Sequence, residues 1–527
     1  MNFSIAKINF NTKPVSFRNN TQSRSTNSNF ERTPDKDTFE LSIGYVNDIH
    51  GQVNNMMRIL SGLKGDIKLS AGDNDIGDEK NTQIHQATAE FMNKANITAT
   101  ALGNHELDGR QADVTNFIDN TNTKVLAVNF NKCDNWENFE DNLKEYGRDN
   151  LDERLTKSMI VEVKGEKIGL VGASPTDLFS RITHPEYHKD CYVSDIDETV
   201  ERLQHEIDNL KEEGVNKIVM VSHLGYQKDR EIAQKLDGLD VIIGGHTHEL
   251  IEGIKEGENL VYSKSGEPVI ITEAGKDGKY FGQLNLLFDK DGVITKAQNN
   301  VAQTHLFSKN LVTQYLFDRV MGKPQDVGYI KEAPLPPHSL LDENPHANFV
   351  CDAMKFETNA DIALWNNSGI RNYFHEGSID TREIKEIAPF MDRVCIADVS
   401  EKTIVDTFKH AIESSYNSHG NKPGLISVSG LEYTVNLNNG KLVEMNFIDK
   451  DGNKTPIDID NPREDKIYRV TADEYMMCTG TDYLKLAEKE DVLEILPYDK
   501  DVVTCNYIKY LNQPIVINQT GRVKFVD

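Results

Sequence analysis

Seven side chains with metal-binding chemistry follow five strand-like runs in the first half of the sequence. They are two carboxylates, one amide and four imidazoles: Asp48, His50, Asp73, Asn104, His223, His246 and His248. A mixed nitrogen and oxygen set without thiolate suits Zn²⁺, Mn²⁺ or Fe²⁺, whereas Ca²⁺ prefers oxygen ligands alone. Seven ligands are too many for one tetrahedral ion, but they suit two divalent ions that share a bridging carboxylate. Two such ions, about 3.5–4 Å apart, can clamp a phosphate.

A candidate catalytic pair lies beside one of these ligands, in the motif Gly103-Asn104-His105-Glu106-Leu107-Asp108. If Asn104 binds a metal ion, the neighbouring His105 points elsewhere and is free to protonate a leaving oxygen. Asp108, three residues later, could orient the imidazole and keep it cationic. The alternative is that His105 and Asp108 form a surface pair at the start of a helix.

The elements that must position the ligands are short apolar runs typical of strands. Residues 82–94 and 200–210 have helical spacing between these runs, and Gly214 ends the second helix. A single histidine after a strand is most often a hydrogen-bonded loop residue. In open α/β sheets, however, ligands bind where the carboxyl ends of several strands meet, and five coincidences favour one shared site. The predicted strands cover residues 41–46, 66–71, 97–102, 217–221 and 239–243.

The length of 527 residues allows more than one domain. A helical stripe from Leu311 to Val320, followed by Gly322 and several prolines, predicts a linker helix and connector over residues 306–335. It would separate a metal-binding domain, residues 38–305, from a second α/β domain, residues 336–527. Residues 1–37, rich in Asn, Ser and Thr, predict a disordered leader, with an organelle transit peptide as the alternative.

Composition excludes several classes of protein. The 58 Lys and Arg against 84 Asp and Glu give a net charge of −26, which argues against a nucleic-acid polymer or an anionic membrane as partner. The six cysteines contain no CxxC pair, so we expect structural thiols. No secretory signal and no apolar run near 18 residues can be read, so we expect no membrane insertion and, on sequence alone, a cytoplasmic location.

The ligand motifs resemble the metallophosphoesterase signature and, more fully, the 5′-nucleotidase family, which includes UDP-sugar hydrolases and 2′,3′-cyclic phosphodiesterases. In the first half the matching segments are Asp48-x-His50, Gly72-Asp73, Gly103 to Glu106, Ser222-His223, Gly245 to His248, and Ala274 to Gly282. In the second half they are Asn366 to Arg371, Ala388 to Phe390, Ser429-Gly430, and Thr479 to Tyr483. Most members of this family are periplasmic or at the cell surface.

The resemblance implies an α/β protein with a four-layer α/β/β/α metallophosphoesterase domain, a linker helix and a second α/β nucleotide-binding domain that rotates to deliver substrate. His105 with Asp108 would be the catalytic dyad. One ion would be held by Asp48, His50, Asp73 and His248. The other would be held by Asp73, Asn104, His223 and His246. The substrate would be contacted by Asn366, Arg371, Phe390, Tyr475 and Thr481.

The second domain departs from the family pattern at two places. The segment Ser339 to Asn344 replaces the family's arginines, so that only Arg371 remains of the usual arginine cluster. Thr481 replaces the carboxylate that meets the ribose hydroxyls, unless that carboxylate is displaced to Asp482. The aromatic rings of Phe390 and Tyr475 would sandwich the base; the alternative is that both are ordinary core aromatics.

The expected function is therefore hydrolysis of a nucleoside 5′-monophosphate to nucleoside and phosphate, by an enzyme with two divalent metal ions such as Zn²⁺ or Mn²⁺. The alternatives within enzymes are a 2′,3′-cyclic nucleotide phosphodiesterase and a UDP-sugar hydrolase. A different class is a nucleotide-binding module without turnover, although a decayed site should have lost ligands first. The expected partner is a small nucleotide, and the sequence leaves the base and the oligomeric state open.

Overall fold

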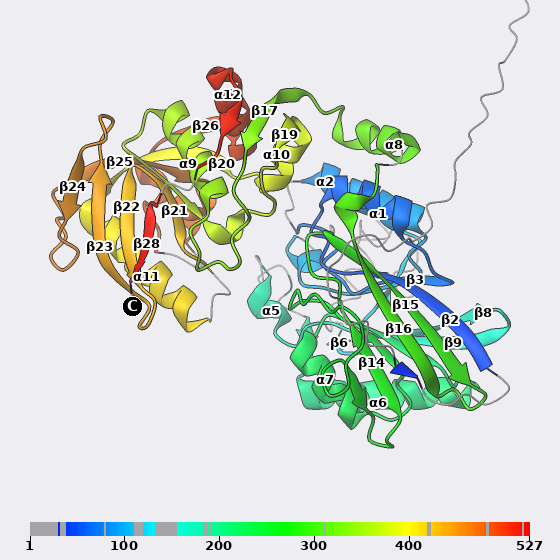
Figure 1. The fold of residues 1–527 in the computed structure, drawn as a ribbon. Coiled ribbons are helices and arrows are strands. Elements are labelled where there is room, and N and C mark those ends of the chain that lie inside the picture. Colours follow the sequence, from blue (N-terminus) through cyan, green and yellow to red (C-terminus); the bar gives the residue numbers. More distant parts are fainter. Residues whose placement is uncertain are drawn as a thin grey trace, which may run out of the picture.

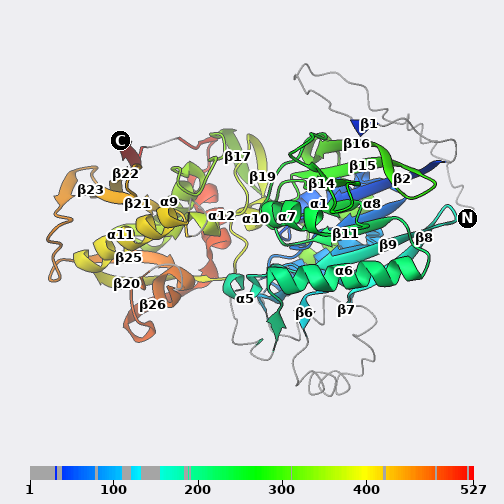
Figure 2. The same ribbon diagram turned by 90° about the horizontal axis from the view of Figure 1, so that it is seen from below.

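The computed structural model describes residues 30–31, 38–77, 81–109, 120–131, 155–182, 188, 191–309, 311–418, 423–480, 484–518 and 521–526. Two α/β halves lie side by side, connected by the chain that runs from helix α8 (Leu311–Met321) to strand β17 (Asp326–Glu332) (Figures 1 and 2). No described helix is long and apolar enough to cross a membrane. The cysteines in the described part of the chain are free.

The first half contains an eight-stranded sheet in the order β1-β16-β15-β2-β3-β4-β5-β7. Strands β2 to β7 are parallel in this sheet, whereas β15 and β16 pair antiparallel at one side. The strands are β1 (Phe30–Glu31), β2 (Thr38–Val46), β3 (Ile67–Ser70), β4 (Ala99–Ala101), β5 (Lys124–Leu126), β7 (Leu155–Thr156), β15 (Tyr280–Asp289) and β16 (Ile294–Gln303).

Strand β1 lies within residues 1–37, the segment predicted to be a disordered leader. Phe30 and Glu31 pair with Ala297 and Lys296 of β16, so this part of the segment adds an edge strand. The pairing satisfies backbone groups of β16 that would otherwise form an open sheet edge. The other leader residues, 1–29 and 32–37, lie outside the described part of the chain.

A six-stranded sheet packs against the first, in the order β13-β14-β12-β11-β9-β8. Its four inner strands are parallel, and β8 and β13 pair antiparallel at the two edges. The strands are β8 (Ser158–Val163), β9 (Glu166–Ala173), β11 (Ile218–Ser222), β12 (Val241–Ile243), β13 (Leu260–Tyr262) and β14 (Pro268–Thr272).

The layers of the first half follow from which faces are apolar. Buried side chains from both sheets, such as Ile43 and Val241, form one core between them. Helices α1 (Val53–Gly62), α2 (Thr82–Ala95) and α8 cover the outer face of the eight-stranded sheet. Helices α6 (Ile196–Glu212) and α7 (Tyr226–Lys235) cover the outer face of the other sheet (Figure 2). The predicted four-layer α/β/β/α arrangement is confirmed.

The second half contains sheets of five, four and three strands, ordered β21-β18-β25-β20-β26, β24-β23-β22-β28 and β19-β17-β27. Its helices are α9 (Pro345–Thr358), α10 (Thr381–Ile387), α11 (Glu401–Asn417) and α12 (Lys500–Leu511). Its strands are β18 (Ile362–Asn366), β19 (Gly377–Asp380), β20 (Arg393–Ser400), β21 (Ile426–Ser429), β22 (Leu431–Asn436), β23 (Lys441–Ile448), β24 (Lys454–Ile457), β25 (Ile467–Asp473), β26 (Val492–Asp499), β27 (Ile515–Val516) and β28 (Val523–Val526). Two buried clusters form its cores.

Candidate functional site

The seven predicted ligands converge at the carboxyl ends of five parallel strands. Three of these strands belong to the eight-stranded sheet and two to the six-stranded sheet, so the site lies where the ends of both sheets meet. The strands are β2 for Asp48 and His50, β3 for Asp73, β4 for Asn104, β11 for His223, and β12 for His246 and His248.

Several ligands have a backbone conformation that non-glycine residues rarely adopt. Their φ angles are positive, a region that costs a residue with a Cβ atom of order 1 kcal/mol or more. Such strain persists only where surrounding contacts hold the backbone, and it concentrates at functional sites. The angles are 48° for Asp48, 50° for His50, 48° for Asp73, 79° for His246 and 63° for His248.

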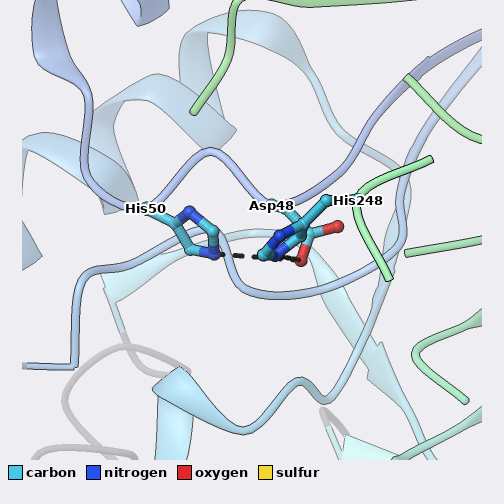
Figure 3. Close-up of side chains that lie close together, drawn as sticks. All are labelled: Asp48, His50 and His248. Atoms are coloured by element: carbon cyan, nitrogen blue, oxygen red, sulfur yellow. Dashed lines mark ion pairs between the residues drawn. The ribbon is translucent and has the colours of Figure 1, made fainter. Parts of the chain in front are cut away.

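The first group of ligands surrounds the carboxylate of Asp48. Its Oδ1 lies 3.4 Å from His248 Nε2 and 3.8 Å from His50 Nε2, and both imidazoles are directed toward it (Figure 3). His50 Nε2 also lies 3.8 Å from Asp73 Oδ2. These separations leave room for a cation among the donors, and the group matches the residues that the resemblance assigns to one ion.

The second group shares Asp73 with the first. Asp73 Oδ2 lies 3.1 Å from His223 Nε2, and the rings of His223 and His246 are 5.0 Å apart. The carboxylate of Asp73 therefore faces both groups, as a bridging ligand must. Asp177, which the sequence analysis missed, also approaches this group, with its Oδ1 at 3.7 Å from His246 Nε2.

Among the predicted ligands, three buried side-chain atoms form no hydrogen bond to a described residue: His50 Nε2, His223 Nε2 and Asn104 Oδ1. Buried polar atoms are almost always paired, so these three need a partner. Burial alone would lower the pKa of His223, but the negative charges of Asp73 and Asp48 raise it to about 10. The electrostatic potential at this imidazole is therefore negative and favours a cation. These residues therefore supply nitrogen and oxygen ligands of the kind that divalent transition-metal cations bind.

Asp277 orients one of the ligands and was not singled out from the sequence. Its Oδ1 lies 3.0 Å from His50 Nδ1, so that Nε2 of the ring is left to face the cluster. Its backbone nitrogen donates to the Asp48 carbonyl at 2.6 Å, and its own φ is 59°. A carboxylate behind a metal-binding histidine fixes the tautomer and orientation of the ring. Its only sequence signal was its place in the matched segment Ala274 to Gly282.

Asp108 Oδ2 is hydrogen-bonded to His105 Nδ1, the contact that the predicted catalytic dyad requires. His105 Nε2 lies 4.0 Å from Asp73 Oδ2, so the ring borders the cluster. Between the two residues, Glu106 accepts hydrogen bonds from the backbone nitrogens of Asp73 and Gly103 at 3.1 and 2.9 Å. Burial, together with the charge of Asp73, raises the pKa of Glu106 to about 7.

Two of the predicted substrate residues of the second half, Arg371 and Phe390, contact each other. The guanidinium of Arg371 lies over the Phe390 ring, 5.2 Å from its centre. Burial lowers the pKa of Arg371, whereas the negative charges of Asp277, Asp108 and Asp73 raise it. Its Nε is buried and has no hydrogen-bond partner among the described residues.

Of the other predicted substrate residues, the structure describes Asn366 and Tyr475 but not Thr481. Asn366 ends β18 and donates from Nδ2 to Ser368 Oγ at 2.9 Å. Tyr475 is half-buried and begins the short π-helix Tyr475–Thr479, while Thr481 and Asp482 lie outside the described residues. The pairing of Phe390 with Tyr475 around a base stays a prediction.

The segment that replaces the family's arginines has a local structural role. Asp342 Oδ2 accepts hydrogen bonds from the backbone nitrogens of His338 and Ser339 at 2.8 and 2.9 Å, which closes a turn. Asn344 then caps helix α9, since its side chain accepts from Ala347 N at 3.2 Å. These side chains shape the entry to α9 and do not replace the missing cations.

Hydrogen bonds join the two halves beside the site. Gln52 accepts from Asn372 Nδ2 at 3.2 Å, one residue after Arg371. Asn81, at the start of α2, donates to the carbonyl of Pro389 at 3.1 Å. The loops that carry Arg371 and Phe390 are therefore each bonded to the metal-binding half.

Two known protein families match successive parts of the chain. A family model described as calcineurin-like phosphoesterase matches residues 41–250. A second, described as 5′-nucleotidase, C-terminal domain, matches residues 327–488. The matches confirm the resemblance seen in the motifs.

Two relatives and one solved structure illustrate the likeness. The chain is 26% identical to the trifunctional nucleotide phosphoesterase protein YfkN of Bacillus subtilis (strain 168), over 94% of this chain and 35% of that protein. It is 26% identical to the 5′-nucleotidase of Diplobatis ommata, over 83% of this chain and 78% of that protein. The chain thus spans about a third of the Bacillus protein and most of the other. The 5′-nucleotidase precursor from Thermus thermophilus shares the fold, with a TM-score of 0.69 at 23% identity, covering 93% of this chain and 100% of that one.

Proposed function

The chain belongs to the family of proteins that join a calcineurin-like phosphoesterase domain to a 5′-nucleotidase C-terminal domain, and from that membership we propose that it hydrolyses nucleoside 5′-monophosphates to nucleoside and phosphate. The observation that supports this most is the position of Arg371. Its guanidinium lies over the Phe390 ring, its buried Nε has no hydrogen-bond partner among the described residues, and the charges of Asp277, Asp108 and Asp73 raise its pKa. A cation and an aromatic ring beside a metal centre suit a phosphate attached to a base.

Calcineurin-like phosphoesterases use divalent metal ions, and we infer two ions here. Asp73 would be shared between them. When bound, the ions would neutralise charge on the phosphate oxygens and activate a water molecule for attack. One ion would be held by Asp48, His50, Asp73 and His248, and the other by Asp73, Asn104, His223 and His246.

The chain's own residues would divide the remaining tasks. Arg371 would bind phosphate oxygens, and its planar guanidinium allows two hydrogen bonds to one phosphate. His105 would hold a proton for the leaving 5′-oxygen, and Asp108 would keep the imidazole oriented for that transfer. Phe390 would stack on the base, with Tyr475 on its other face.

The test is phosphate release from a substrate panel after metal-free protein is loaded with Mn²⁺ or Zn²⁺. The panel contains nucleoside 5′-monophosphates, 2′,3′-cyclic nucleotides, a UDP-sugar and glycerol 2-phosphate, because one relative is named a trifunctional nucleotide phosphoesterase. We expect the highest kcat/KM for the monophosphates. Faster turnover of the cyclic nucleotides or the UDP-sugar would replace the proposal with that activity. Nucleotide binding without release from any substrate would identify a binding module.

A further inference from the structure

Lys500, the first residue of α12, is a fully buried lysine whose partners link separate segments of the second half. Its Nζ lies 2.7 Å from Asp473 Oδ2, and donates to the carbonyl of Asp392 at 3.5 Å. It also lies 5.8 Å from the centre of the Trp365 ring. Lysine is almost never fully buried unless it is paired, and a buried ion pair is weak evidence of a role in stability. We therefore looked for a role of the Lys500 ammonium group other than stabilising the fold.

The strands around Lys500 bring the two predicted base-stacking loops to one end of a sheet. Strands β20 and β25 are antiparallel, with Val394 opposite Asp473. The chain before β20 and the chain after β25 consequently emerge at the same end. Phe390 lies in the first of these segments, and Tyr475 lies in the second. Strand β26 also ends there, and α12 begins with Lys500.

The partners of Lys500 are close in sequence to both aromatic residues. Asp392, whose carbonyl it binds, lies two residues after Phe390. Asp473, whose carboxylate it binds, lies two residues before Tyr475. One ammonium group therefore joins the two loops from inside the domain.

The carboxylate of Asp473 also shapes the turn that carries Tyr475. Its Oδ1 accepts a hydrogen bond from Met476 N at 2.8 Å, while its Oδ2 binds Lys500. Outside the domain core, Arg393 forms a second tie between the loops. Its Nε and Nη2 donate to the two carboxylate oxygens of Glu474 at 3.1 and 3.0 Å. The Tyr475 turn is thus attached to β20 by one buried and one exposed contact.

We propose that Lys500, with Arg393 as an outer tie, is a positioning residue that fixes the separation of Phe390 and Tyr475 and so determines affinity for the nucleobase. This inference rests on the proposed function, because it assigns the two aromatic residues to a base. A purely structural ion pair would affect every substrate alike. A positioning pair affects only substrates that have a base.

The test compares a nucleoside 5′-monophosphate with glycerol 2-phosphate, which has no ring to stack. In the double variant Lys500→Gln, Asp473→Asn, a shorter neutral amide pair replaces the ion pair and leaves no unpaired buried charge. We expect KM for the nucleotide to rise about five-fold or more, the lower end of what one stacked base contributes. We expect kcat/KM for glycerol 2-phosphate to change less than about two-fold, and the bound metal to be unchanged.

Two further variants keep the test decisive. Arg393→Ala removes the two side-chain hydrogen bonds to Glu474 and leaves the one from the Arg393 backbone nitrogen at 3.2 Å. The arginine side chain is 51% exposed, so this variant should fold and should shift the nucleotide KM in the same direction. If the double variant does not fold, Arg393→Ala decides by the same criteria. The control is Arg522→Met, which removes another paired cation of the second half, bonded to Asp352 at 2.8 Å. It should leave the ratio of the two activities unchanged.

Equal losses for both substrates, an unchanged nucleotide KM, or the same selective loss in Arg522→Met would each overturn the role of Lys500. These outcomes differ from failure of the proposed function, which would appear in the unaltered protein as no preference for the nucleotide over glycerol 2-phosphate. If the unaltered protein has that preference and the double variant retains it, only the positioning role is wrong.

Discussion

Glu386 in the second half accepts two hydrogen bonds from Asn54 in the first, one from the backbone nitrogen at 2.6 Å and one from Nδ2 at 3.0 Å. Asn54 lies in the first turn of α1, where backbone N–H groups have no partner within the helix. It follows His50 by four residues, and Glu386 precedes Phe390 by four. One buried carboxylate therefore joins the segment after His50 to the segment before Phe390.

We expect Glu386→Ala to lower kcat/KM about ten-fold for both a nucleotide and glycerol 2-phosphate. The end of α10, whose Ile387 carbonyl accepts a hydrogen bond from the Arg371 backbone nitrogen at 3.0 Å, loses two hydrogen bonds to the first half, each contributing about 0.5–1.5 kcal/mol. Bound metal should not change. Metal analysis and steady-state kinetics check this, with the exposed Glu376→Gln as control. Unaltered kinetics would show that the contact does not position the loop.

Asp277→Asn should weaken metal binding about 10- to 100-fold, the usual cost of losing the carboxylate behind a metal-binding histidine. The reason is its 3.0 Å contact with His50 Nδ1, which directs Nε2 toward the cluster. Titration against a chelator measures the change. Asp291→Asn, in the exposed turn before β16, is the matched control. Equal affinities in the two variants would exclude this role for Asp277.

His105→Ala should leave the metal content unchanged and lower kcat by roughly 10²–10⁴, the range for one positioned proton donor. Asp108→Asn should cost less and add little on top of His105→Ala, because the two residues act as one unit. Metal analysis with kcat values for the two single variants and the double variant tests this. Loss of metal from His105→Ala would place His105 among the ligands instead.

His346 should make the protein less stable in acid. Burial beside the rings of Tyr373 and Phe374 lowers its pKa to about 4, from 6.5 in the unfolded chain. Since the unfolded chain takes up this proton first, the contribution to the free energy of unfolding is full above pH 6.5. It declines as the pH falls toward 4, by up to about 3 kcal/mol.

Urea unfolding of His346→Phe, compared with the unaltered protein at pH 7 and pH 4.5, measures this contribution. The variant should lose less stability between the two pH values. Parallel losses in both proteins would assign the acid sensitivity to other groups.

The convergence of the seven predicted ligands could be predicted from the sequence because each lies in the loop after a strand, and the carboxyl ends of parallel strands converge. The contact of Asp277 with His50 could not be predicted from the sequence, because it depends on the path of the loop between β14 and β15. The bond from Asn54 to Glu386 joins residues 332 positions apart, and no local period predicts such a pairing. Strand β1 was missed because the polar segment around Phe30 has no strand pattern of its own.

A single titration can show whether the protein has a dinuclear centre that acts on nucleotides. Metal-free protein is titrated with Mn²⁺ while bound metal and phosphate release from a nucleoside 5′-monophosphate are measured together. We expect two ions per chain, with full turnover only after the second binds, and at most one ion with almost no turnover in Asp73→Asn. Full turnover with one ion per chain, or two ions and ordinary turnover in Asp73→Asn, would contradict the account.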